Sequence, residues 1–315
     1  MEKHDLVVIG GGVSGLAAAI SAKKSGIEDI VLIELEDELG GILNQCIHNG
    51  FGKEIFKEEL TGTEYVQKFI DEFLELNITY KLNTMVTSIS NDKVVNAVNE
   101  KDGIIEIKAK SIIWAAGALD KMKKNIRFLS NGLSGIYSAV MVQKLINVDG
   151  YMPGKSMIIL GANKIGVLLA KRIFLEGGKV KAVIDNELDL EKRDETIESL
   201  AEVNIPFLYD YKVVRLKGKD RLEGVYILAR GEEKFISCDT LILASKLLPN
   251  DKLIKKANIK KADSVGNIHK VSTNVPGIFI VGNSSYIHEF NSQDIVLESY
   301  EIGEISAEYV NMNEE

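Results

Sequence analysis

The sequence has little cysteine: only Cys46 and Cys238 occur among its 315 residues. Two thiols in unrelated local contexts cannot supply a disulfide framework, a C-x-x-C pair or the spacing of a zinc site. The sequence therefore predicts no metal site. It also predicts no dithiol–disulphide cycle within the chain.

Long hydrophobic runs and an excess of positive charge are also missing. No apolar run reaches the ~18 residues that suggest a membrane-spanning helix, and the N-terminus has no signal-peptide pattern. The net charge of −8 and the pI near 5.3 argue against a nucleic-acid or anionic-membrane partner. With 45% hydrophobic and 27% charged residues, the chain is typical of a globular protein of one large or two ordinary domains. We expect a cytoplasmic location.

Glycine, in contrast, follows a distinctive pattern near the N-terminus. An apolar strand over residues 5–9 runs into Gly10, Gly12 and Gly15, spaced as G-x-G-x-x-G, and an alanine-rich helix follows. The first glycine permits a tight turn, the second lets backbone approach a pyrophosphate, and the third lets helix and strand pack closely. A second apolar strand ends at Glu34, nineteen residues after Gly15, where an acid can accept hydrogen bonds from a ribose diol. This combination predicts an adenine-dinucleotide site.

A second unit of the same design begins near residue 156. A strand over residues 156–160 leads into Gly161 and Gly166, a helix follows to about residue 176, and the next strand ends at Asp185. Asp185 again lies nineteen residues beyond the last glycine of the turn, but Asn163 stands where the central glycine would be. The chain therefore carries an internal repeat of a strand–turn–helix–strand unit.

Each unit is followed by short β segments that predict a β-meander insert, after which the unit closes on another buried strand. They cover residues 84–90, 94–98, 103–108 and 111–115 after the first unit, and 211–216, 221–229, 234–237 and 240–244 after the second. A strand within residues 275–283 and a helix over 294–309 complete the chain. The predicted fold is α/β, with two Rossmann-like dinucleotide-binding domains that carry β-meander inserts, the second domain being inserted into the first.

This order of elements resembles the pyridine nucleotide-disulphide oxidoreductase superfamily over essentially the whole chain. Three further stretches match: Gly40-Gly41, Trp114-Ala-Ala-Gly117, and Val275 to Asn283, where Asn283 replaces the acid of the family motif. The resemblance implies a discontinuous FAD-binding domain (residues 1–120 and 248–315) and an NAD(P)-binding-like domain (residues 121–247).

The resemblance also implies the residues that contact the cofactors. For FAD these are Gly10, Gly12, Val13, Ser14, Gly15, Glu34, Leu35, Gly41, Val86, Ala116, Gly117, Gly282 and Asn283. For NAD(P) they are Gly161, Gly166 and Asp185.

A narrower resemblance is to the FAD/NAD oxidoreductase that accompanies anaerobic glycerol-3-phosphate dehydrogenases. It rests on residues 39–52 and on residues 136–154. It implies a flavin-dependent dehydrogenase subunit as partner, while the oligomeric state is left open, a homodimer included.

Cys46 and His48 are the candidate catalytic residues, because they lie in a segment expected to approach the flavin. A thiol there can attack a disulphide or the flavin, and an imidazole can shuttle a proton near neutral pH. The alternative is that Cys46 fills space in a loop and that His48 bonds backbone. His288, shortly after the Gly282–Asn283 turn, is a further candidate neighbour of the flavin.

The second unit departs from the family pattern at Asn163, at Lys246 and at Leu119. Two hypotheses therefore stay open. In the first, the protein is an FAD-dependent NAD(P)H oxidoreductase that passes electrons to a partner or a small acceptor. In the second, it is an FAD-bearing electron-transfer or binding subunit whose second domain no longer binds NAD.

Overall fold

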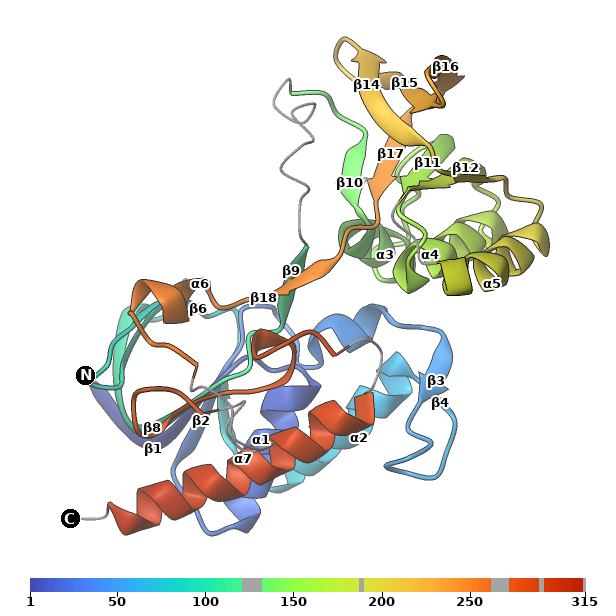
Figure 1. Cartoon of the computed structure of the whole chain (residues 1–315). Helices are drawn as coiled ribbons and strands as arrows, with labels where there is room; N and C mark the ends of the chain where they lie inside the picture. The colour runs from blue at the N-terminus through green and yellow to red at the C-terminus, as the bar shows by residue number, and fades with distance from the viewer. Residues whose placement is uncertain (121–131, 187–189, 262–271, 289–291, 314–315) are drawn as a thin grey trace. The chain divides into compact units, whose positions relative to one another are not determined.

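The computed structural model describes residues 1–120, 132–186, 190–261, 272–288 and 292–313 (Figure 1). The chain divides into two compact units, one formed by Met1–Leu119 with Leu248–Glu315 and the other by Asp120–Leu247. Each unit contains a parallel sheet with helices packed on it, which confirms the predicted α/β class of two Rossmann-like domains.

The first unit is built on a seven-stranded sheet of order β5-β2-β1-β8-β7-β6, with β19 paired to β8. Its parallel part comprises β1 (Glu2–Ile9), β2 (Ile30–Ile33), β5 (Thr79–Lys81), β8 (Gly103–Trp114) and β19 (Ile278–Ile280). The last four residues of β1 and all of β2 are buried, as expected for parallel strands covered on both faces.

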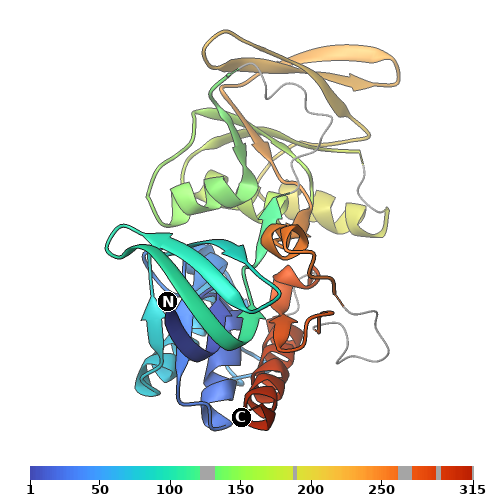
Figure 2. The ribbon, with the colours of Figure 1, turned by 90° about the vertical axis from the view of Figure 1, so that its left-hand side faces the viewer.

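The β-meander of the first unit is continuous with that sheet. Strand β6 (Met85–Ile89) pairs antiparallel with β7 (Val94–Asn99), and β7 pairs antiparallel with the first half of β8 (Figure 2). The second half of β8 pairs in parallel with β1 and β19. The prediction of separate strands over 103–108 and 111–115 was therefore wrong. Neither Ala109 nor Lys110 is a turn-forming residue, so β8 continues without a break across these positions and joins the meander to the parallel sheet.

Three helices cover one face of this sheet: α1 (Val13–Lys24), α2 (Gly62–Glu75) and α7 (Ser292–Met312). Helix α2 begins with a capping box in which Thr61 and Glu64 bond each other's backbone N–H groups. Helix α7 packs closely on α1 at Gly303, where any Cβ would overlap the Ala18 carbonyl oxygen, so the close approach requires glycine. The remaining elements of the unit are η1 (Gly41–Gln45), β3 (Asn49–Phe51), β4 (Leu60–Thr61), α6 (Lys252–Lys256) and η4 (Gly282–Ser284).

The second unit has a five-stranded parallel sheet of order β10-β17-β11-β12-β13. Its strands are β10 (Ile136–Ser138), β11 (Ser156–Leu160), β12 (Lys179–Asp185), β13 (Phe207–Tyr209) and β17 (Thr240–Leu243), and its helices are α3 (Ala139–Asn147), α4 (Lys164–Leu175) and α5 (Leu190–Ala201). Its meander forms a sheet of its own from β14 (Lys212–Gly218), β15 (Leu222–Ala229) and β16 (Glu232–Ser237). Two short strands, β9 (Ala118–Asp120) and β18 (Leu247–Pro249), pair separately.

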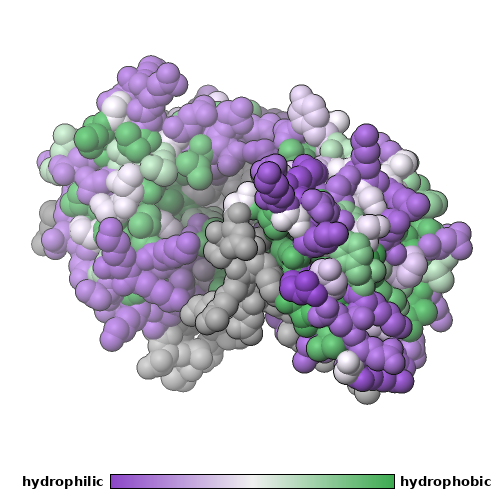
Figure 3. All heavy atoms as spheres, turned by 90° about the horizontal axis from the view of Figure 1, so that it is seen from above, coloured by the Kyte–Doolittle hydropathy of each residue, from purple (hydrophilic) through white to green (hydrophobic). Residues whose placement is uncertain are grey.

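The surface seen from above mixes hydrophilic residues with scattered hydrophobic ones (Figure 3). Within the described ranges, no helix combines the length and the apolar character needed to cross a membrane.

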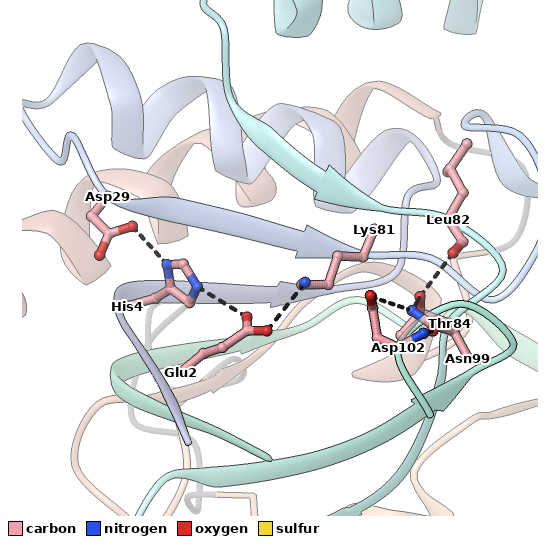
Figure 4. A network of polar contacts seen from close by, with 8 residues as sticks. All are labelled: Glu2, His4, Asp29, Lys81, Leu82, Thr84, Asn99 and Asp102. Carbon is pink, nitrogen blue, oxygen red and sulfur yellow. Dashed lines mark hydrogen bonds and ion pairs between the residues drawn. The ribbon is translucent and has the colours of Figure 1, made fainter. Parts of the chain in front are cut away.

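A polar network holds the beginning of β1, at the end of the sheet opposite the glycine turn (Figure 4). His4 Nδ1 lies 2.6 Å from Asp29 Oδ1, Glu2 Oε2 lies 3.6 Å from His4 Nε2, and Glu2 Oε1 forms an ion pair of 3.3 Å with Lys81 Nζ. Since β1 is the central parallel strand, these contacts fix the strand that delivers the glycine turn.

Candidate dinucleotide-binding sites

Two glycines of the first turn are required by the packing of the protein itself. Gly10 has φ +110°, which favours glycine, and a Cβ there would overlap the Ala115 carbonyl oxygen. A Cβ on Gly15 would overlap the Gly10 carbonyl oxygen. These two residues therefore let β1, β8 and α1 approach one another closely.

Gly12 is different, because no atom of the described residues requires a glycine there. Its φ of −75° is open to any residue, and the nearest atom to a Cβ at this position is Gly41 Cα at 4.0 Å. The Gly12 position provides no side-chain cap for α1, so the amide groups of the first turn of the helix, which includes Val13, lack that acceptor. An open space before an uncapped helix N-terminus is a cradle for an anion, and the residues present fit the pyrophosphate of a dinucleotide.

Glu34 follows β2 and is held at this turn. It is 8% exposed, and its two carboxylate oxygens accept the N–H groups of Gly11 at 2.5 Å and Glu36 at 2.8 Å. Each carboxylate oxygen can accept a second hydrogen bond, so Glu34 retains capacity for a ribose hydroxyl. Leu35, next in the chain, is 57% exposed.

Thr84 joins Glu34 to the meander. Its N–H donates to the Glu34 carbonyl at 2.8 Å, while Asn99 Nδ2 donates to its hydroxyl at 3.2 Å (Figure 4). Val86 lies two residues further on, in β6, and is half-buried. The Thr84 N–H thus anchors the start of the meander to the backbone of Glu34.

Residues from the end of the chain also reach the first turn. A Cβ on Gly282 would overlap Ser14 Oγ, so these two predicted FAD contacts are neighbours. The Gly117 carbonyl accepts hydrogen bonds from Ser284 Oγ at 3.2 Å and from Asn250 N at 3.0 Å. Asn250 Nδ2 donates to the Ala116 carbonyl at 3.2 Å. Segments far apart in sequence are thus brought together beside the N-terminus of α1.

Cys46 and His48 have local partners in the structure. Cys46 is half-buried, its Sγ donates to the Ile42 carbonyl at 3.5 Å, and its side chain packs against the core cluster of α1 and α2. His48 Nδ1 lies 2.8 Å from the Asn49 carbonyl, and its ring is 5.3 Å from that of Phe51. These contacts agree with the structural alternative for both residues.

Cys238 belongs to the second unit and is only 4% exposed. Burial, followed by the negative charge of Asp239, raises the pKa of the Cys238 thiol to about 11. The thiol is therefore protonated and unreactive at neutral pH.

The sequence did not predict a histidine–glutamate pair that follows the Gly282–Asn283 turn. His288 Nε2 lies 3.2 Å from Glu298 Oε2, with the side chains only 3% and 13% exposed. The Tyr286 ring is 4.0 Å from the His288 ring, and Asn283 Oδ1 accepts the His288 N–H at 3.0 Å. Burial, and then the charges of Glu298 and Asp294, raise the pKa of Tyr286. No sequence pattern pairs a loop histidine with a glutamate ten residues later.

The second turn repeats the first in atomic detail. Gly161 has φ +114°, and a Cβ there would overlap the Ala244 carbonyl oxygen, as Gly10 does with Ala115. A Cβ on Gly166 would overlap the Gly161 carbonyl. Asp185 Oδ2 accepts the Ala162 N–H at 2.6 Å, the bond that Glu34 makes with Gly11. The acid that follows the second strand is thus held in the same way in both units.

Asn163 is where the two turns differ. Its Oδ1 accepts the Gly166 N–H at 3.0 Å, which makes Asn163 the N-cap of α4. Its Nδ2 donates to the Ala244 carbonyl at 3.1 Å and to the Ser245 carbonyl at 3.4 Å. The side chain is thus folded back onto the turn. Lys246 is exposed, whereas Leu119 is half-buried.

The part of the chain that the structure describes has no cluster of three or more His, Cys, Asp or Glu side chains able to hold a metal ion.

Comparison with known proteins gives one family. Residues 4–293 match the family model described as pyridine nucleotide-disulphide oxidoreductase. The NAD(P)H sulfur oxidoreductase (CoA-dependent) of Pyrococcus abyssi is 24% identical over 89% of this chain and 62% of its own length. The thioredoxin reductase of Mycoplasmopsis pulmonis is 24% identical over 89% of both chains.

An alkyl hydroperoxide reductase subunit of Staphylococcus aureus is 25% identical over 90% of this chain and 54% of its own length. The chain thus spans only about half to two thirds of most of these relatives.

Solved structures show the same fold. A thioredoxin reductase from T. acidophilum matches with a TM-score of 0.72 and 20% identity over 99% of both chains. The bacillithiol disulfide reductase Bdr from Bacillus cereus matches with a TM-score of 0.77 and 17% identity, over 99% of this chain and all of the other.

Proposed function

Because the chain belongs to the pyridine nucleotide-disulphide oxidoreductase family, whose members are FAD-dependent enzymes that use NAD(P)H, we propose that it passes electrons between NAD(P)H and a second acceptor through FAD. The observation that carries the proposal is the pair of turns, each with two packing glycines and an acid bonded to the turn backbone. In this proposal the second acceptor is either a partner dehydrogenase or a small molecule.

The first unit supplies the FAD site in this proposal. The open space at Gly12 and the N-terminus of α1 would hold the pyrophosphate, and Glu34 would hold the ribose. When bound, FAD supplies an acceptor for a hydride and a store for two electrons. The protein contributes binding and orientation.

The second unit supplies the NAD(P)H site. Asp185 stands where it can accept hydrogen bonds from a ribose diol, and its negative charge disfavours a 2′-phosphate. NADH is therefore the expected donor. Asp185→Asn should narrow the preference for NADH over NADPH, which the ratio of the two kcat/KM values measures; an unchanged ratio would remove Asp185 from this role.

Electrons do not pass through a cysteine pair of this chain in the proposed mechanism. Cys46 and Cys238 belong to different units, and the Cys238 thiol has its pKa raised to about 11. The chain in this respect departs from the disulphide chemistry in the family's name.

The proposed partner is a flavin-dependent dehydrogenase subunit that acts on a small hydroxy or amino compound, such as glycerol 3-phosphate. Its support is the resemblance of residues 39–52 and 136–154 to the oxidoreductase subunits described above. Co-purification from the native source tests it. Recovery of the chain alone, as monomer or homodimer, with full turnover of a small substrate would leave a self-sufficient reductase.

The alternative, an FAD-bearing electron-transfer subunit without an NAD site, is favoured by one observation, the occupied N-cap at Asn163. Turnover with an artificial dye acceptor separates the two. The proposal expects the FAD-loaded chain to oxidise NADH at the expense of the dye. An FAD-loaded chain that oxidises neither NADH nor NADPH would support the alternative.

A further inference from the structure

We propose that Asn163 competes with the pyrophosphate of the nucleotide in the second unit, so that binding there requires the Asn163 side chain to leave its cap. Asn163 can act in this way only if the second turn takes a dinucleotide, as proposed above. The residue would then set the affinity of the donor site without touching the reacting atoms.

The comparison of the two turns shows what Asn163 adds. At the first turn the N-cap residue of α1 is Gly12, which offers the Gly15 amide no side-chain acceptor. At the second turn the corresponding amide, that of Gly166, already donates to Asn163 Oδ1 at 3.0 Å. A phosphate oxygen approaching α4 therefore meets a helix N-terminus with one donor in use.

The Asn163 amide nitrogen also holds the side chain in its capping position. Its donations to the Ala244 and Ser245 carbonyls tie the turn to the segment that follows β17. These carbonyls belong to residues 81 and 82 positions further along the chain, so the side chain is held both by its own turn and by a distant segment. A ligand must break bonds at both ends of the amide to reach the helix N-terminus.

The backbone conformation of the turn does not require an asparagine at position 163. Asn163 has φ −67° and ψ 170°, and Gly12 has φ −75° and ψ 178° at the same place in the first unit. Either residue can therefore occupy either turn. Since glycine is itself accepted at an N-cap, Asn163→Gly is expected to fold while it frees the Gly166 amide.

The test measures ligand binding to the full-length, FAD-loaded chain by isothermal titration calorimetry, with ADP-ribose and NADH as probes. ADP-ribose carries the pyrophosphate and both riboses but cannot reduce flavin, so the readout does not depend on activity. Asn163→Gly is expected to bind both probes about tenfold more tightly than the native chain. Asn163→Ala should gain less affinity, because the alanine Cβ remains in the path of the pyrophosphate.

Asn163→Ser and Asn163→Asp are the matched controls, because both retain an oxygen that can cap Gly166. The serine variant keeps the cap but lacks the amide nitrogen that bonds Ala244 and Ser245, so its affinity for the probes should lie between those of the native chain and Asn163→Gly. The aspartate variant should bind about tenfold more weakly, since it keeps the cap and adds a negative charge next to the phosphates. The FAD content should stay constant throughout, because all four substitutions lie in the second unit.

A loss of affinity in both Asn163→Gly and Asn163→Ala would overturn the proposal, because it would mean that the amide itself donates to the phosphates. Unchanged affinity in both variants would overturn it as well. Failure of the proposed function is a separate result: the native chain would leave its flavin oxidised in excess NADH. A native chain that fails in this way, with a glycine variant that gains binding, would still support the role of Asn163.

Discussion

The glycines of the first turn serve two different purposes, which substitution can separate. At Gly15 a Cβ would overlap the Gly10 carbonyl, whereas at Gly12 the nearest protein atom is 4.0 Å away. Gly15 is therefore needed by the fold, and Gly12 by the ligand that the turn is proposed to hold.

We predict that Gly12→Ala folds but loses most of its FAD, because its Cβ fills the pyrophosphate cradle without touching the protein. Gly15→Ala should lower the free energy of unfolding by about 1–3 kcal/mol or more through overpacking. Thermal unfolding and the FAD released per chain measure the two effects. A Gly12→Ala protein with full FAD content would contradict the assignment of the turn.

The two thiols should differ strongly in reactivity. With a pKa of about 11, Cys238 holds roughly one hundred times less thiolate at pH 8 than a thiol with the reference value of 9.0. We predict that a thiol reagent modifies Cys46 in the native protein and Cys238 only after denaturation. Mass spectrometry of the labelled protein checks the order of modification. Labelling of Cys238 before Cys46 would contradict the burial of the Cys238 side chain.

Cys46→Ser is expected to keep its FAD, since the Cys46 side chain bonds the Ile42 carbonyl and packs on the core. Titration should also find two free thiols before and after treatment with NADH. Loss of both thiols on oxidation, with a Cys46–Cys238 bridge, would establish the dithiol cycle that the sequence argues against.

At the scale of elements, the sequence predicted what depends on local pattern. Strand, glycine turn and helix were predicted from spacing, and the helix expected at 294–309 is Ser292–Met312. The strand expected within 275–283 is only Ile278–Ile280, because Gly282 turns the chain with φ +62°. What depends on partners distant in sequence could not be predicted.

Two features show this limit. The first meander joins the main sheet through β8 while the second forms its own sheet, although both have similar segment patterns. The role of Asn163 as a cap depends on carbonyls of Ala244 and Ser245 that only the folded sheet brings near. The sequence shows that Asn163 replaces the central glycine of the second turn, but it does not show where the Asn163 side chain points.

Asp239 links the start of β11 to that of β17 and should make the second unit sensitive to acid. Burial opposes its ionisation, but hydrogen bonds from the Lys155 and Ser156 amides and from Thr240, with the charge of Arg221, hold the pKa of Asp239 below its usual value of 3.8. A lowered pKa in the folded state stabilises the fold above pH 3.8, and this contribution is lost as the pH falls through the folded value.

We predict that the thermal stability of the second unit falls as the pH drops below 3.8, and that Asp239→Asn flattens this part of the profile. The variant should be less stable than the native chain at pH 7. Unfolding followed by circular dichroism across this pH range gives both comparisons. An equally steep profile in the variant would assign the acid sensitivity to other carboxyl groups.

For the whole molecule, the central observation is that one chain contains the same turn twice, in two units, with one difference between them. Both turns keep the two packing glycines and the acid, while Asn163 caps the helix of the second. In the proposed function the first turn holds FAD and the second holds the nucleotide that reduces it. An NAD site weakened by Asn163 remains compatible with this division, provided that the cap can open.

The most direct measurement is an anaerobic titration of the purified, FAD-loaded native chain with NADH, followed by the visible absorption of the flavin. The proposed function predicts that the flavin band bleaches in proportion to the NADH added and ends near one NADH per FAD, with recovery on admission of an acceptor. A band that persists in excess NADH and NADPH, but bleaches with a chemical reductant, would contradict the claim that the second unit delivers electrons to the first.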